Sequence, residues 1–195
     1  MNSKLNVMLA ALAGLCAWNA PVHAQNTFIY APVPPATKLE MFETNTGTVL
    51  IKSAAVIGSM SISGGSVSVT CKEDAEPATG RKEYGIIIAL ALEQTPASED
   101  RTVVDYEELD SLLKALDALA TIDWSVSSLA SFDAVYQTKG GFKIAAFSVR
   151  RSGTVEHSLR SSRMTKKIVI TSSQWAEFRG LIDQARRKIE ELRGK

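Results

Sequence analysis

Two amphipathic helical stretches, each preceded by a run of short alternating segments, constrain the fold of this chain more than any other feature. In the first stretch, Asp105 and Glu108 have the spacing of a capping box. In the second, Thr171 and Gln174 repeat that spacing 66 residues further on. The two apolar stripes are Leu109, Leu112, Leu113, Leu116 and Leu119, and Trp175, Phe178, Ile182, Ala185 and Ile189. Each helix must bury its stripe, and only a sheet offers a large enough apolar surface.

The segments before each helix alternate apolar and polar residues, as half-buried strands do. The four strands expected in the first half are 48–62, 67–72, 85–93 and 101–104, with a polar loop at 73–82, and 39–44 is a candidate for an additional short strand before them. Those expected in the second half are 132–138, 142–150, 154–160 and 167–170. Gly64-Gly65 and Gly140-Gly141 are tight-turn signals, and Gly58 predicts a bend or bulge. The sequence therefore predicts an α+β fold, with antiparallel sheets and one helix packed on each in a repeated ββββα-ββββα order.

A doubled ββββα order is similar to the topology of the Whirly and PUR-type proteins, which bind single-stranded nucleic acids. The resemblance is one of element order alone, since the sequence motifs of those proteins are not found in this chain. It implies binding of single-stranded nucleic acid as one expectation to be tested.

The first 24 residues have the features of a secretory signal peptide. Lys4 supplies a positive start, 7–17 is an apolar stretch, and Val22-His23-Ala24 is a small-x-small cleavage signal. The apolar stretch is too short for a membrane-spanning helix, which needs about twenty residues. We expect cleavage after Ala24, export to the periplasm or the cell exterior, and no stable membrane span afterwards. Residues 25–37, with three prolines, are expected to form an extended spacer before a single domain, 38–195, with halves 38–124 and 125–195.

Cysteine and histidine content argues against several kinds of site. After cleavage Cys71 is the one remaining cysteine, which excludes an intramolecular disulfide and favours a bacterial envelope protein. Cys71 shares a strand face with Val67 and Val69, and His157 shares one with Leu159, so we interpret both as packed core residues. The sequence shows no catalytic motif, no His/Cys pair at metal-ligand spacing and no phosphate-binding glycine loop. We therefore predict no catalytic residue, metal or cofactor.

Charge is distributed unevenly between the two halves. Residues 25–124 contain 7 Lys/Arg against 15 Asp/Glu, a net charge of −8. Residues 125–195 contain 14 Lys/Arg against 6 Asp/Glu, a net charge of +8. Opposite charges favour attraction between the halves, or head-to-tail self-association of copies; ordinary surface charge on one domain is the alternative.

Six basic residues on or between the last predicted strands are the candidate ligand-binding patch. They are Arg150, Arg151, Arg160, Arg163, Lys166 and Lys167. With Tyr136 and Phe142 as nearby stacking surfaces, this patch would suit single-stranded nucleic acid or an anionic envelope component. The alternative is a solvated sheet edge whose positive charge complements the acidic first half.

The function predicted from these features is non-catalytic binding of a protein or small ligand in the bacterial envelope. Two alternatives stay open at this point. One is binding of single-stranded nucleic acid or another polyanion through the basic half. The other is a hydrolase whose site is assembled from residues distant in the sequence.

Overall fold

The computed structural model of the protein describes residues 35–93, 98–150 and 152–194. The predicted signal peptide 1–24, most of the predicted spacer 25–37 and Arg151 of the predicted basic patch lie outside these residues. The described chain is an α+β structure with two four-stranded antiparallel sheets and three α-helices, which confirms the predicted class.

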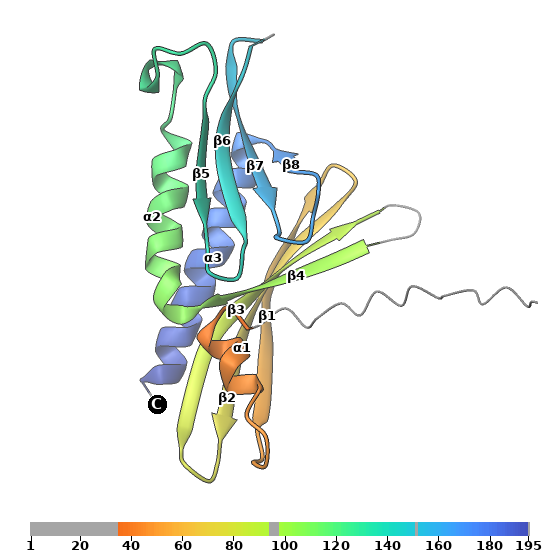
Figure 1. Ribbon diagram of the computed structural model, residues 1–195, viewed down its shortest axis with the longest axis vertical. Coiled ribbons are helices and arrows are strands. Elements are labelled where there is room, and N and C mark those ends of the chain that lie inside the picture. Colours follow the sequence, from red (N-terminus) through yellow and green to blue (C-terminus); the bar gives the residue numbers. More distant parts are fainter. Residues whose placement is uncertain (1–34, 94–97, 151, 195) are drawn as a thin grey trace, which may run out of the picture. The chain divides into compact units, whose positions relative to one another are not determined.

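The first sheet has the chain order β1 (Ile51–Ile62), β2 (Gly65–Glu76), β3 (Arg81–Leu92) and β4 (Ser98–Asp105), as Figure 1 shows. The register shifts between Val56 and Gly58, which confirms the predicted bulge in β1. The predicted loop at 73–82 is wrong, because β2 and β3 stay paired as far as Glu76 and Arg81. The polar side chains there pair across the strands, as Lys82 does with Glu73 at 3.5 Å, so polarity did not end the strands.

A helix stands where the sequence predicted a strand at 39–44. This helix, α1 (Lys38–Glu43), starts with a capping box of Thr37 and Glu40. The Asp105 carboxylate accepts hydrogen bonds from the amides of Lys38 and Leu39 at 2.9 and 3.1 Å. Asp105 therefore caps α1, and the predicted capping box of Asp105 with Glu108 is wrong.

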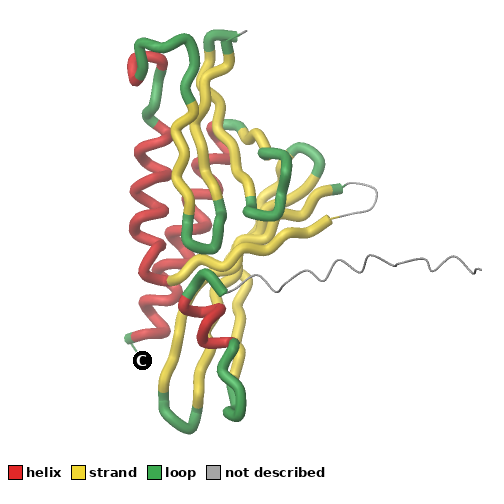
Figure 2. The backbone as a smooth tube through the Cα atoms, viewed as in Figure 1, coloured by secondary structure: helices red, strands yellow, loops and turns green. Residues whose placement is uncertain are grey.

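The two long helices bury their predicted stripes. A 3-10 turn, η1 (Tyr106–Glu108), leads into α2 (Leu109–Ala120), and α3 (Ser172–Arg193) begins with the predicted capping box of Thr171 and Gln174. Figure 2 shows α2 and α3 running side by side. The predicted repeat, with one helix on each sheet, is not met in that simple form, because α3 lies against α2 and β1–β3 while α2 also contacts β5 and β6.

The second sheet follows a second 3-10 turn, η2 (Trp124–Val126), and again keeps chain order. Its strands are β5 (Asp133–Gln137), β6 (Lys143–Val149), β7 (Thr154–Arg160) and β8 (Ile168–Ile170). These bounds agree with the predicted segments to within one residue, because each segment is short, alternating and bounded by turn residues.

One apolar core is shared by both sheets and by α2 and α3. The Trp175 indole of α3 donates to the Leu116 carbonyl of α2 at 3.1 Å and packs against the tilted ring of His157 of β7, with 4.6 Å between ring centroids. Phe142 and Phe178 are fully buried, with 5.8 Å between their ring centroids. Each large side chain buried in this way contributes about 1.5–3 kcal/mol, so the core fixes the second sheet relative to the helices.

Candidate functional site

A groove of about 500 Å³ lies on the face of the second sheet that points away from the core. The inward face carries Ile144, Ala146 and Leu159, which are all fully buried. On the outward face Val135 and Val169 keep 52% and 44% of their surface exposed. Because side chains alternate along a strand, the outward face is a separate surface built from the intervening residues.

The register of the strands arranges this outward face in three rows. The middle row, from β5 to β8, is Val135, Ala145, Ser158 and Val169. One flanking row is Asp133, Phe147 and Glu156. The other flanking row places Lys143 of β6 directly opposite Arg160 of β7. The groove therefore has a mainly apolar middle, with the basic pair of Lys143 and Arg160 at one end.

Four basic side chains line the groove, against the single carboxylate of Asp133. Lys143 and Arg160 come from the strands, and Lys166 and Lys167 come from the segment just before β8. Within the described ranges, none of these four lies within 4 Å of a carboxylate oxygen. The Lys167 ammonium lies instead 3.1 Å from the centroid of the Phe147 ring. The groove thus concentrates positive charge, and within the described residues none of its four basic side chains forms a close ion pair.

The structure brings together part of the basic patch predicted from sequence. Arg160, Lys166 and Lys167 line the groove, and Arg163 joins Lys166 in an adjoining hollow of about 350 Å³. That hollow also contains acidic residues of β4, Glu99 and Asp100. Arg163 therefore faces a mixed surface rather than the basic groove.

The remaining members of the predicted patch do not line the groove, and one basic residue that does line it was missing from the prediction. Arg150 donates to the Ala130 carbonyl at 3.2 Å and is not among the groove residues, while Arg151 lies outside the described residues. Lys143 lines the groove but was absent from the prediction. Its signal was its place after the Gly140-Gly141 turn, on the strand that pairs with the one ending at Arg160.

The two aromatic residues proposed as stacking surfaces do not reach this face. Phe142 is fully buried in the core, and Tyr136 packs against that core from the inward face of β5. Burial is also the main reason that the pKa of the Tyr136 phenol is raised. The prediction of stacking by these residues is therefore wrong.

Cys71 and His157 are core residues, as the sequence predicted. Cys71 is 2% exposed, and its thiol donates to the Ala185 carbonyl at 3.4 Å. Burial raises the pKa of this thiol to about 11, so it is protonated at neutral pH. The imidazole Nε2 of His157 hydrogen-bonds with the Leu119 carbonyl at 3.1 Å. Among the described residues, no cluster of histidine, cysteine and carboxylate side chains is arranged to hold a metal ion.

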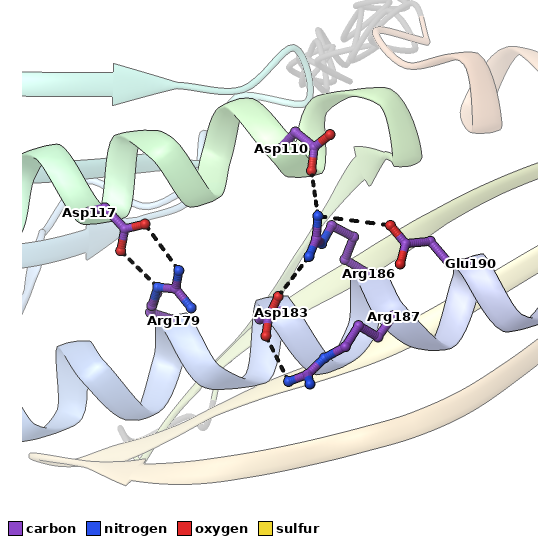
Figure 3. Close-up of polar contacts among 7 residues, drawn as sticks. All are labelled: Asp110, Asp117, Arg179, Asp183, Arg186, Arg187 and Glu190. Atoms are coloured by element: carbon purple, nitrogen blue, oxygen red, sulfur yellow. Dashed lines mark hydrogen bonds and ion pairs between the residues drawn. The ribbon is translucent and has the colours of Figure 1, made fainter.

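Opposite charges of the two halves meet between α2 and α3 (Figure 3). Arg179 makes a two-pronged pair with Asp117, at 2.8 and 3.0 Å, and Arg186 pairs with Asp110 at 3.0 Å. Arg186 also donates to Asp183 at 3.2 Å on its own helix. Arg179 and Arg186 of α3 are thus paired with carboxylates within the chain, unlike the basic residues of the groove. Head-to-tail association through the charged halves stays a prediction.

Comparison with known proteins gives no relative for this chain: no family model, no curated protein and no solved structure matches it. The likeness to Whirly and PUR-type proteins stays one of predicted element order. Within the described part of the chain, no helix has both the length and the apolar character required to cross a membrane.

Proposed function

We propose that this chain is a non-catalytic binding protein of the bacterial envelope, and that the groove on its second sheet takes an anionic ligand with two or more negative groups. The observation that carries the proposal is the cross-strand pair of Lys143 and Arg160, two like charges directly opposite each other without a carboxylate partner among the described residues. The export signals of the sequence support the envelope as its location.

An anion is the ligand that such a pair favours. Like charges directly opposite in a sheet are destabilising, by about 0.2–1 kcal/mol for a pair of this kind. An anion between Lys143 and Arg160 converts that repulsion into two attractions. The Arg160 guanidinium offers a planar fork of donors that suits carboxylate and phosphate groups, and Lys143 offers a point charge.

The other groove residues favour a ligand with more than one anionic group. Lys166 and Lys167 border the same groove, so a second negative group can meet a second pair of cations. The hydroxyls of Ser158 and Thr165 are further polar groups in the lining. The apolar middle row offers contact to carbon atoms between the charged groups of the ligand.

Single-stranded nucleic acid is the less favoured anion. Proteins that bind it without sequence preference stack bases on exposed aromatic rings. On this face the one aromatic residue of the rows is Phe147, and the Lys167 ammonium already covers its ring. A ligand recognised by its charged groups agrees better with this surface.

The test is calorimetric titration of the exported protein with tripolyphosphate, a short poly-glutamate and a thymidine oligonucleotide. We expect Lys166→Gln/Lys167→Gln to weaken binding of the preferred anion at least about tenfold, which is about 1.4 kcal/mol. The matched control is Lys114→Gln/Lys139→Gln, which removes the same charge from two exposed lysines outside the groove. We expect it to change the affinity less than about twofold.

Three outcomes would count against the proposal. They are absence of binding to all three anions, equal weakening by the two double variants, and a preference for the oligonucleotide over the other anions. The last outcome would favour the nucleic-acid alternative. In each titration, raising the salt concentration should weaken specific binding, because the four basic side chains of the groove are half-buried or exposed.

A further inference from the structure

Strand β1 is a long open edge of the first sheet. It forms one end of the strand order and is twelve residues long. Residues 51–56 are all exposed, on both faces of the strand. Two large apolar side chains of this stretch, Ile51 and Val56, keep 52% and 75% of their surface exposed, and Val49 just before the strand keeps 72%. Long exposed edges with apolar side chains are templates for pairing with another strand.

The opposite edge of the same sheet is covered. Gly140 of the second-sheet hairpin lies so close to β4 that a Cβ atom there would be 2.1 Å from the Val103 carbonyl oxygen. The Thr102 and Ser161 hydroxyls are 2.8 Å apart across the same contact. By contrast, the main chain of residues 51–58 in β1 forms hydrogen bonds only with β2 among the described residues. The first such contact is at Ser61, whose carbonyl accepts from Gln174 at 2.8 Å.

We propose that β1 pairs antiparallel with β1 of a second copy of this chain, across a two-fold axis at Ala54. This pairing joins the two first sheets into one continuous sheet of eight strands. A two-fold axis perpendicular to the sheet keeps each face of β1 on the same side in both copies. Because facing residues in an antiparallel pair point to the same side of the sheet, one residue must face its own copy, and the axis lies midway between these two. The interface is isologous, with the same residues on both sides.

The residues around Ala54 are complementary to themselves in this register. Ala54 faces Ala54 of the second copy, Ser53 faces Ala55, and Lys52 faces Val56. The centre of the pairing therefore has only small side chains. The Lys52 ammonium pairs with Glu43 of its own copy at 2.9 Å, and the aliphatic part of Lys52 would lie beside the exposed Val56 of the other copy. The self-complementary sequence is the reason that the proposed occupant is a second copy and not an unrelated strand.

Two features place the axis at Ala54 and not at a neighbouring residue. An axis nearer Lys52 would bring the lysines of the two copies together, whereas an axis at Ala54 separates them by four residues along the strand, about 13 Å. An axis further on would bring the bulge between Val56 and Gly58 into the ladder. No residue of β1 lines the groove of the second sheet, so this proposal does not depend on the proposed function.

Disulfide cross-linking tests both the pairing and its register. In an antiparallel pair, facing Cα atoms are about 4.5–5.5 Å apart, which allows a disulfide. We expect the exported Ala54→Cys protein to form a cross-linked dimer under mild oxidation. The matched control is Val56→Cys on the same strand, whose two copies lie about 13 Å apart and should not cross-link. A mixture of Lys52→Cys and Val56→Cys proteins should cross-link, because these positions face each other.

A charge swap at the axis tests the same contact without oxidation. Ala54→Lys and Ala54→Glu should each weaken the dimer at least about tenfold in sedimentation equilibrium, because like charges then face each other. Mixing the two variants should restore the dimer. Val126→Lys, at another exposed apolar position, is the control and should leave association unchanged. Circular dichroism and thermal melts establish that each variant is folded.

The proposal is overturned if the protein stays monomeric throughout the concentration series. It is also overturned if Ala54→Cys and Val56→Cys cross-link equally, or if the two charge variants still dimerise as the unsubstituted protein does. Anion binding by the groove is measured separately on the same variants. Its loss or retention therefore reports on the proposed function and not on the dimer.

Discussion

Replacing Arg160 by glutamate should make the protein more stable while it weakens anion binding. Arg160 faces Lys143 across β7 and β6, and no described carboxylate pairs with either side chain. The substitution exchanges a repulsive cross-strand pair for an attractive one. Most substitutions destabilise a protein, so a gain in stability at this position would be a specific signature of unrelieved repulsion.

The expected gain follows from the geometry of the pair. A cross-strand charge pair changes stability by about 0.2–1 kcal/mol, and the substitution removes a repulsion as well as adding an attraction. Both side chains are partly exposed, so solvent reduces the effect, and Arg160→Glu also loses some packing of the arginine stem. We expect a net gain of roughly 0.5–1 kcal/mol in the free energy of unfolding. In a chain of this size that raises the melting temperature by roughly 1–4 °C.

Urea denaturation of three proteins measures this effect. Arg160→Gln removes the repulsion without adding an attraction, so its stability should lie between those of the unsubstituted protein and Arg160→Glu. At 1 M salt the Debye length falls to about 3 Å, and the three proteins should become nearly equal in stability. In the titrations, Arg160→Glu should weaken anion binding more than Arg160→Gln does.

Two results would refute this reasoning. One is an Arg160→Glu protein less stable than Arg160→Gln, which would mean that a carboxylate opposite Lys143 adds no attraction. The other is unchanged anion affinity in Arg160→Glu, which would remove Arg160 from the binding site.

Two glycines and one ion pair allow further predictions about the fold. Gly140→Ala should destabilise the protein by about 1–3 kcal/mol, because the new Cβ would overlap the Val103 carbonyl. Gly180→Ala should stabilise it by about 0.5–1 kcal/mol, because this glycine lies inside α3 with no atom within 4 Å of the new Cβ. Equal effects in urea denaturation would contradict this contrast. The hydrogen bond from Arg179 lowers the pKa of Asp117, so its stabilising effect is present above the unfolded-state pKa and is lost as the pH falls through the folded-state pKa. Asp117→Asn should therefore be less stable than the unsubstituted protein at pH 7 and nearly equal to it in strong acid; a difference independent of pH would show that this pair does not contribute as inferred.

Local patterns predicted most of the secondary structure because they depend on neighbours within a few residues. Alternation located the strands of the second sheet, the capping box of Thr171 and Gln174 located the start of α3, and the apolar stripes identified the buried helix faces. Strand alternation also identified Cys71 and His157 as core residues.

The errors arose where a distant group decided the local structure. Asp105 had a partner at capping-box spacing, yet its carboxylate caps α1, whose amides lie 66 and 67 residues away in sequence. Glu108 likewise accepts from the Lys139 amide at 2.8 Å. A carboxylate caps the helix start or turn that the tertiary fold brings close to it. The spacing of residues along the chain does not show which helix start or turn that will be.

The sequence by itself determined the fold class, the positions of most strands and the presence of a basic second half. Only the tertiary structure decided which basic residues share a surface. Alternation shows that neighbouring residues point to opposite faces, but not which face the helices cover or which residues stand opposite each other. The core contacts of α2 and α3 cover one face of the second sheet, which buries Phe142 inside it. The register of β6 and β7 then places Lys143 opposite Arg160 on the free face, because the apolar pattern of the buried face and the geometry of the turn, and not the side-chain charges, set that pairing.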